Sequence, residues 1–211
     1  MRFSIVIACN DTKVMLDNLL RSPDICNHDL NIKQGFKKPC IAYNEAIKDC
    51  KEDIIIFVHQ DVYLPETFFG DLTVAIGKLC YANWGVLGVA GKLDELFFAN
   101  VLDRKRLLKT NEIKPVEVYT LDELLLVIKK EKFKQLQFDE DIPNHHLFGT
   151  DICLQAETLG LRNYVIDAYC EHNSSLVTLP KCYQISEKYI QRKWAHLLPI
   201  HTTCSIIEDY K

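Results

Sequence analysis

The chain alternates between short, almost wholly apolar segments and longer segments in which apolar residues recur at helical spacing. Residues 3–9 and 54–58 are rich in isoleucine and valine, which predicts strands covered on both faces, as in a parallel sheet. Residues 12–20 and 41–50 carry apolar side chains three and four positions apart, which predicts amphipathic helices. A strand, a turn and a helix in this order are typical of an α/β domain.

The later part of the chain gives a more mixed pattern. Residues 92–117 are polar and irregular, which indicates a hairpin or a loop. Residues 121–128 fit either a capped helix or a strand, because periodicity does not separate the two over so short a run. The remaining pattern predicts strands at 30–33, 84–90 and 164–170 and helices at 66–81, 151–159 and 185–198.

Composition narrows the class of protein. The 211 residues suggest one domain over 1–211, and 48% hydrophobic residues suffice for a packed core. A net charge of −4 argues against nucleic acid as the main partner. No apolar run is long enough to cross a bilayer, and no signal peptide is evident. The nine cysteines include no C-x-x-C pair, which favours a reduced, cytoplasmic chain.

Three of the predicted strands end in polar residues that bind ligands. Cys9-Asn10-Asp11 follows the first, His59-Gln60-Asp61 a second and Glu171-His172 a third. Open α/β sheets bind ligands at the carboxyl ends of their strands. If these strands are parallel neighbours, Asp61, His59 and His172 form a divalent-metal site that suits Mn²⁺, or Mg²⁺ with help from ligand phosphates.

Each of these side chains also has an ordinary structural interpretation. Asp61 can cap a turn, His59 can be a hydrogen-bonded core residue, and His172 can bond to a nearby serine. A second polar group, His145-His146 with Asp151, lies near the start of a predicted helix. Asp151 is there either an acid favoured by the helix dipole or a general base.

Five stretches in a fixed order resemble the family 2 glycosyltransferases of the GT-A fold, in particular their short bacterial glycosyltransferase-like branch. They are FSIVIACND (3–11), AYNEAI (42–47), IIIFVHQDVYLPE (54–66), LDELLLVIKKE (121–131) and FDED to HNSS (138–175). The resemblance implies a single Rossmann-like α/β domain, with a mostly parallel central sheet and helices on both faces. It also favours a strand at 124–128.

The resemblance implies roles for individual residues. His59-Gln60-Asp61 stands where the family has its D-x-D motif, so the first acid is replaced by histidine. His172 matches a late histidine that some members use as a metal ligand, and Asp151 matches best the acid that activates the acceptor. The usual E-D pair is absent, which leaves Asp139, Glu140 and Asp141 as substitutes for that acid. The implied nucleotide-sugar site comprises Cys9, Asn10, Asp11, Asn44, Gln60 and Asp61.

The expected activity is therefore an inverting, metal-dependent glycosyl transfer from a UDP-, GDP- or dTDP-sugar to a carbohydrate or lipid-linked acceptor. The expected setting is polysaccharide or glycoconjugate synthesis in the bacterial cytoplasm, either in the cytosol or at the inner face of the membrane. Two alternatives stay open: a non-catalytic binding domain of the same fold, and a zinc-dependent hydrolase. The hydrolase would combine Asp61, His145 or His146, Asp151 and His172.

Overall fold

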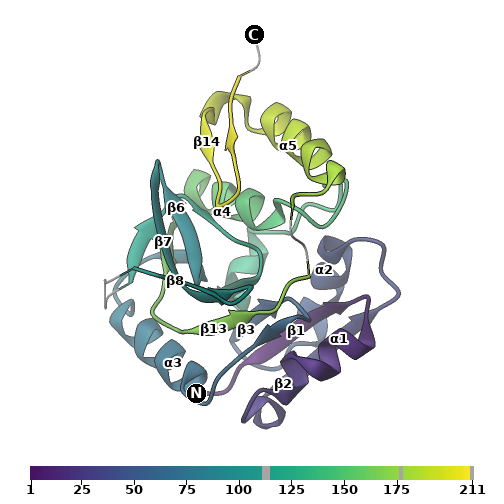
Figure 1. Cartoon of the computed structure of the whole chain (residues 1–211). Helices are drawn as coiled ribbons and strands as arrows, with labels where there is room; N and C mark the ends of the chain where they lie inside the picture. The colour runs from purple at the N-terminus through teal and green to yellow at the C-terminus, as the bar shows by residue number, and fades with distance from the viewer. Residues whose placement is uncertain (111–114, 176–177, 210–211) are drawn as a thin grey trace.

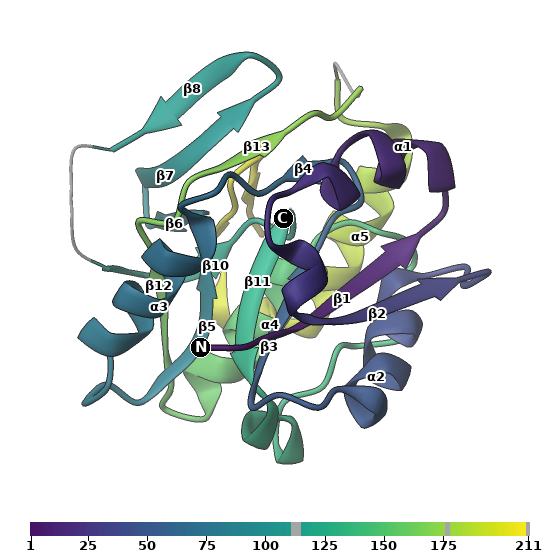
Figure 2. The same cartoon turned by 90° about the horizontal axis from the view of Figure 1, so that it is seen from below.

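The computed structural model describes residues 1–110, 115–175 and 178–209 and is built around one large twisted sheet (Figures 1 and 2). Seven strands form this sheet, in the order β2, β1, β3, β11, β5, β12, β9. Their bounds are Asp29–Gln34, Ser4–Cys9, Ile54–Val58, Leu125–Lys129, Trp84–Gly88, Arg162–Val165 and Val116–Val118.

The strands of this sheet run mostly in one direction. β1 pairs in parallel with β2 and β3, and β5 pairs in parallel with β12. β11 runs antiparallel to both β3 and β5, and β9 runs antiparallel to β12. The prediction of a mostly parallel central sheet is confirmed. β11 confirms the strand that the resemblance favoured over a helix at 124–128.

Helices cover both faces of the sheet because side chains on its strands alternate between two apolar cores. On β1, Ile5 and Ile7 join one core, whereas Val6 joins the other. The first core is closed by α1 (Thr12–Asp17) and α3 (Phe68–Lys78). The second is closed by α2 (Pro39–Asp49), α4 (Phe148–Thr158) and α5 (Lys181–Lys193).

A second sheet lies beside the carboxyl ends of the central strands. It is formed by β10, β6, β7, β13 and β4, and β8 pairs with β7. Most of it comes from the segment expected to be a hairpin or loop. The bounds are Thr120–Leu121, Ala90–Leu93, Leu96–Asp103, Cys170–His172, Val62–Tyr63 and Arg106–Lys109.

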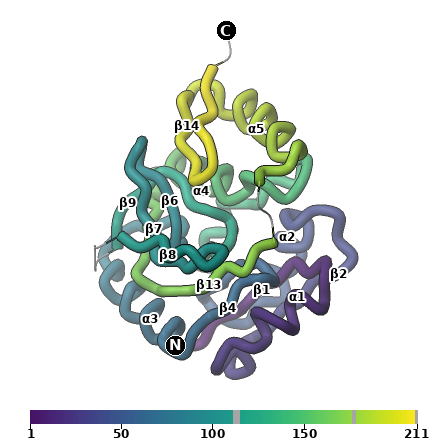
Figure 3. Tube along the Cα trace, viewed as in Figure 1, coloured from purple at the N-terminus to yellow at the C-terminus, as the bar shows by residue number. Residues whose placement is uncertain are grey.

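The C-terminal part of the chain packs on α4, away from the N-terminus (Figures 1 and 3). After α5 it forms a small two-stranded sheet, β14 (Ile200–His201) with β15 (Ile206–Ile207). Short 3₁₀ turns occupy Leu19–Arg21, Ile25–Asn27, Lys130–Lys134 and Ala195–Leu197. Within the described residues no helix is long and apolar enough to cross a bilayer, and the nine cysteines are free thiols.

The strand predicted over 164–170 is wrong, because the chain changes sheets within it. β12 ends at Val165, and the Ile166 N–H makes the last bond to β5 at the Gly88 carbonyl. The Asn100 side chain of β7 then donates to Asp167 at 2.7 Å, which holds the crossing chain against the second sheet. Helix bounds also differ: α4 begins at Phe148, three residues earlier than expected, and α5 spans Lys181–Lys193.

Candidate functional site

The turns that follow β1 and β3 are joined by one side chain. Gln60 Oε1 accepts the backbone N–H groups of Asn10 and Asp11 at 3.0 Å each, and its Nε2 donates to Asn10 Oδ1 at 2.5 Å. Because β1 and β3 are parallel neighbours, both turns lie at the same edge of the sheet. Gln60 therefore holds the two turns together at this edge of the sheet.

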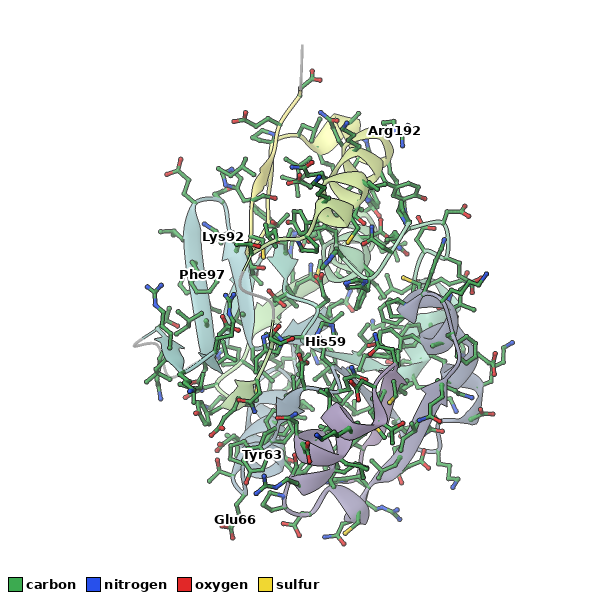
Figure 4. The ribbon with its side chains drawn as sticks, turned by 45° about the vertical axis from the view of Figure 1, so that its right-hand side comes forward. His59, Tyr63, Glu66, Lys92, Phe97 and Arg192 are labelled. Carbon is green, nitrogen blue, oxygen red and sulfur yellow. The ribbon has the colours of Figure 1, made fainter. Side chains whose placement is uncertain are left out.

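A cavity of about 590 Å³ opens at this edge, within the size range of small-molecule sites. The turns after β1 and β3 line it, together with β7, β13, residues 145–147 and the start of α5. Figure 4 places His59 near the middle of the molecule, between the hairpin of Lys92 and Phe97 and the N-terminal segments. The cavity is thus built from segments that are far apart in sequence.

Three metal-ligating side chains meet in this cavity. One ligand atom from each of His59, Asp61 and His172 lies within 4.8 Å of the other two, and all three residues are half-buried. The His172 Nε2 atom is 3.6 Å from Asp61 Oδ1, and the two imidazole centroids are 6.0 Å apart. The sequence expectation that positions 61 and 172 lie close together agrees with this distance.

His172 reaches the site by a different route from the one expected. It lies in β13, which belongs to the second sheet and not beside β1 and β3. β13 pairs antiparallel with β4, and His172 stands opposite Val62, the residue after Asp61. The pairing of these two short strands is therefore what places His172 next to the end of β3.

The two histidines differ in their electrostatic environment. Burial lowers the pKa of His59 to about 4 despite the nearby Asp61 carboxylate, so its imidazole is neutral at neutral pH. Burial also opposes charge on His172, but a 2.9 Å hydrogen bond to Asp103 and the charges of Asp61 and Asp122 outweigh it and raise its pKa. His59 is therefore ready to bind a metal, whereas at His172 a metal would compete with a proton.

Three further acids at the site were not identified from the sequence: Asp103, Asp122 and Glu123. Asp103 hydrogen-bonds His172, and Asp122 accepts the Thr203 hydroxyl at 2.7 Å. Burial and the Asp122 charge raise the pKa of Glu123 to about 8. The acid pair comes directly before β11, whose antiparallel direction brings its start to the end of β3. In the sequence, Asp122 and Glu123 are recognisable only as an acid pair before an apolar run. The direction of β11, which decides where the two acids lie, could not be inferred from that pattern.

The structure does not bring Asp151 to this cavity. Its side chain is fully buried in the first turn of α4 and does not line the pocket. Its oxygens accept from Trp194 Nε1, Lys193 Nζ and Gln155 Nε2, each at 2.7 Å. This position does not support the interpretation of Asp151 as a general base, and its bonds instead fasten the end of α5 to α4.

The predicted nucleotide-binding residues fall into two groups. Cys9, Asn10 and Gln60 line the cavity, whereas Asp11 and Asn44 do not. Asp11 is the N-cap of α1 and accepts the N–H groups of Lys13 and Val14. Asn44 bonds to both main-chain groups of Phe138 and to the side chain of Glu140. Both residues hold neighbouring segments in place.

The substitutes considered for the missing acid pair also lie outside the cavity. Asp139 accepts Lys193 Nζ at 2.6 Å and the Tyr189 hydroxyl at 2.7 Å. Neither Glu140 nor Asp141 lines the pocket. Among the described residues, the carboxylates on the cavity wall are Asp61, Asp103, Asp122 and Glu123.

His145 and His146 belong to a separate group. Their ligand atoms and the Cys182 thiol lie within 4.8 Å of one another, and this set shares no member with the cluster of His59, Asp61 and His172. The residues expected to form the metal site of a zinc-dependent hydrolase therefore do not form one cluster.

Comparison with known proteins places this geometry in context. No protein-family model matches the chain. A curated protein, "ATP synthase subunits region ORF 6" of Fuscovulum blasticum, is 30% identical over 163 residues, which is 72% of this chain. The match covers 65% of that protein, so the chain spans less than two thirds of its length.

Several solved structures similar to the chain are glycosyltransferases of the GT-A fold. The 1–349 fragment of S. aureus TarS, in complex with UDP-GlcNAc, superposes with a TM-score of 0.57 at 17% identity, covering 92% of this chain and 66% of that fragment. GalNAc-T7 with UDP, GalNAc and Mn²⁺ gives 0.62 at 12% identity, covering 94% and 52%. The mannosyltransferase PcManGT from Pyrobaculum calidifontis, with GDP-Man and Mn²⁺, gives 0.53 at 14% identity, covering 93% and 61%. These likenesses establish the fold: the chain has the GT-A fold, as its sequence predicted.

Proposed function

We propose that residues 1–211 form one glycosyltransferase domain that transfers a sugar from a nucleoside-diphosphate sugar to a hydroxyl acceptor, with inversion. The observation that carries the proposal is the cluster of His59, Asp61 and His172 at the carboxyl ends of the central strands. It lies in a fold whose solved examples include TarS with UDP-GlcNAc, GalNAc-T7 with UDP and Mn²⁺, and PcManGT with GDP-Man and Mn²⁺.

The donor atoms of this cluster fit a divalent metal. Two imidazoles and one carboxylate suit Mn²⁺, with Mg²⁺ depending more on Asp61. When bound there, the ion would neutralise negative charge developing on the departing diphosphate. Asp103 is 2.9 Å from His172 Nδ1 and so orients the ring with Nε2 toward Asp61.

The nucleotide would lie over the turn after β1. Cys9 and Asn10 line both the main cavity and an adjoining hollow bordered by Gln34 and Phe36. Gln60 keeps this turn rigid through its three bonds to Asn10 and Asp11. Asp11 and Asn44 contribute by holding the surrounding segments. The donor we propose is a UDP-, GDP- or dTDP-sugar.

Glu123 takes the role of general base in place of Asp151. Its carboxyl lines the cavity, and its pKa of about 8 suits proton transfer near neutral pH. Glu123 Oε1 accepts the Leu147 N–H at 3.0 Å, which holds the side chain in position. Inversion requires this base to lie on the face of the sugar opposite the leaving diphosphate.

The acceptor is proposed to be a carbohydrate or a lipid-linked saccharide, in polysaccharide or glycoconjugate synthesis. The compartment proposed is the bacterial cytoplasm, either in the cytosol or at the inner face of the membrane. The surface that would receive the acceptor is the wall formed by residues 145–147 and the start of α5.

Thermal unfolding with a panel of donors tests the proposal. UDP-GlcNAc, GDP-mannose and dTDP-glucose are each added with Mn²⁺ or with a chelator. We expect one donor to raise the melting temperature only with Mn²⁺, and Asp61→Asn to abolish the rise. Glu66→Gln, an exposed acid far from His59 in Figure 4, should keep it.

Two outcomes would oppose the proposal. A shift that survives in Asp61→Asn would remove the metal cluster from donor binding. Donor binding without turnover, in wild type and Glu123→Gln alike, would favour the non-catalytic binding domain. Under the proposal, Glu123→Gln binds donor normally and loses turnover by about 10²–10⁴-fold.

A further inference from the structure

A second set of metal-ligating side chains lies beside the same cavity, and two of its three members line it. His145 and His146 precede α4, and Cys182 is in the first turn of α5. One ligand atom from each lies within 4.8 Å of the other two. Two imidazoles and a thiol are zinc ligands by type, unlike the nitrogen and oxygen donors around Asp61.

His146 carries the observation that points to a ligand. Its residue surface is only 8% exposed, and its Nε2 atom is buried with no hydrogen-bond partner among the described residues. A buried, unbonded imidazole nitrogen is costly, because it has lost water and gained nothing in return. Its other nitrogen, Nδ1, lies 4.0 Å from Glu123 Oε1, which is beyond hydrogen-bond distance.

We propose that His145, His146 and Cys182 bind Zn²⁺ at a site separate from the one at Asp61. Zinc bonds of about 2.0–2.3 Å hold tetrahedral ligand atoms about 3.5 Å apart. The ligand atoms are already within 4.8 Å, and the exposed His145 side chain is able to turn inward. Cys182 binds as the thiolate and releases its proton to solvent.

The site has a structural consequence for the cavity. The Asn144 side chain already donates to the Cys182 carbonyl at 2.7 Å and accepts the Ser186 hydroxyl at 2.9 Å. Zinc would add a further link between α5 and the segment before α4. Since His145 and His146 line the cavity, the fourth zinc position is open to water or to an anionic group of a bound molecule.

Cobalt substitution tests the proposal on the full chain without any nucleotide. Co²⁺ bound to a thiolate gives charge-transfer absorption in the near ultraviolet, whereas Co²⁺ at His59, Asp61 and His172 does not. We expect this absorption in wild type, its loss in Cys182→Ser, and its retention in Asp61→Asn. Cys80→Ser, at an exposed cysteine outside the set, is the control and should retain it.

Zinc affinity measured against a competing chelator gives a second readout. His145→Ala changes an exposed side chain and should weaken Zn²⁺ binding by at least about tenfold. Absence of the absorption in wild type, its persistence in Cys182→Ser, or its loss in Asp61→Asn would overturn the proposal. Unchanged zinc affinity in both Cys182→Ser and His145→Ala would also overturn it. None of these results bears on Mn²⁺-dependent donor binding, which is tested by Asp61→Asn alone.

Discussion

Replacing Asp151 with asparagine separates a structural role from a catalytic one. The carboxylate is fully buried and accepts from Trp194, Lys193 and Gln155, each at 2.7 Å. An asparagine at this position would keep the size of the side chain but lose its charge. One carboxylate oxygen becomes an amide NH₂ group, a hydrogen-bond donor that would face one of the three existing donors. The change should therefore loosen the junction between α4 and α5 and leave the cavity intact.

The expected loss follows from these contacts. Removing one partner of a buried ion pair costs about 3–5 kcal/mol. Lys193 is 29% exposed and keeps a 2.6 Å contact with Asp139, so its charge stays partly compensated. We therefore expect Asp151→Asn to lower the free energy of unfolding by about 2–3 kcal/mol. For a chain of this size the melting temperature should fall by about 5–10 °C.

Urea unfolding followed by tryptophan fluorescence measures this loss, with donor binding and turnover measured on the folded protein. The exposed Asp141→Asn is the matched control on the neighbouring loop and should change stability by less than about 0.5 kcal/mol. If Asp151→Asn unfolded like wild type but lost turnover by about 10²–10⁴-fold, Asp151 would be the base. The structural interpretation would then be refuted.

Three other perturbations test the environment of single residues. Burial would raise the pKa of Asp29, but hydrogen bonds from its neighbours lower it to about 2. The ionised carboxylate therefore stabilises the fold above pH 3.8, and this contribution to the free energy of unfolding should be lost as the pH falls toward 2. Asp29→Asn should lower the free energy of unfolding by about 2 kcal/mol at neutral pH, measured by urea unfolding. Gly91→Ala would place Cβ 2.5 Å from the Thr120 carbonyl oxygen and should cost about 1–3 kcal/mol by the same measurement. Asp103 raises the pKa of His172, so Mn²⁺ affinity measured by calorimetry should fall as the pH drops through that pKa, and Asp103→Asn should move the fall to lower pH.

Each of these predictions has its own contrary result. Identical acid unfolding of wild type and Asp29→Asn would mean that this carboxylate is not stabilised in the fold. Gly77→Ala serves as control for Gly91, because nothing lies within 4 Å of its Cβ position and alanine favours a helix; equal effects of the two substitutions would discount the close approach at Gly91. A pH dependence of Mn²⁺ binding that is unaltered in Asp103→Asn would show that the His172 proton does not compete with the metal.

Much of the fold followed from local pattern. The runs at 3–9 and 54–58 became β1 and β3 because their isoleucine and valine side chains fill both apolar cores. The segment at 164–170 was misjudged because its apolar character continues through a change of sheet. That change depends on contacts such as Asn100 with Asp167, which join positions far apart in sequence.

In the candidate site, too, the residues next to a clear strand could be predicted from the sequence, and those placed by long-range strand pairing could not. His59 and Asp61 were identified because they directly follow a strong strand. Asp122 and Glu123 were not, because the antiparallel direction of β11 decides where they lie. The two interpretations of Asp151 could not be separated, because an acid in the first turn of a helix looks the same in sequence whether it faces a cavity or a lysine of another helix.

A crystal structure of the protein with Mn²⁺ and UDP tests the central claim most directly, since Mn²⁺ is located by its anomalous scattering. The account predicts one ion bonded to His59, Asp61 and His172 and to the diphosphate, with the nucleoside over the turn after β1. An ordered UDP elsewhere, or a Mn²⁺ ion that contacts none of these three side chains, would contradict it.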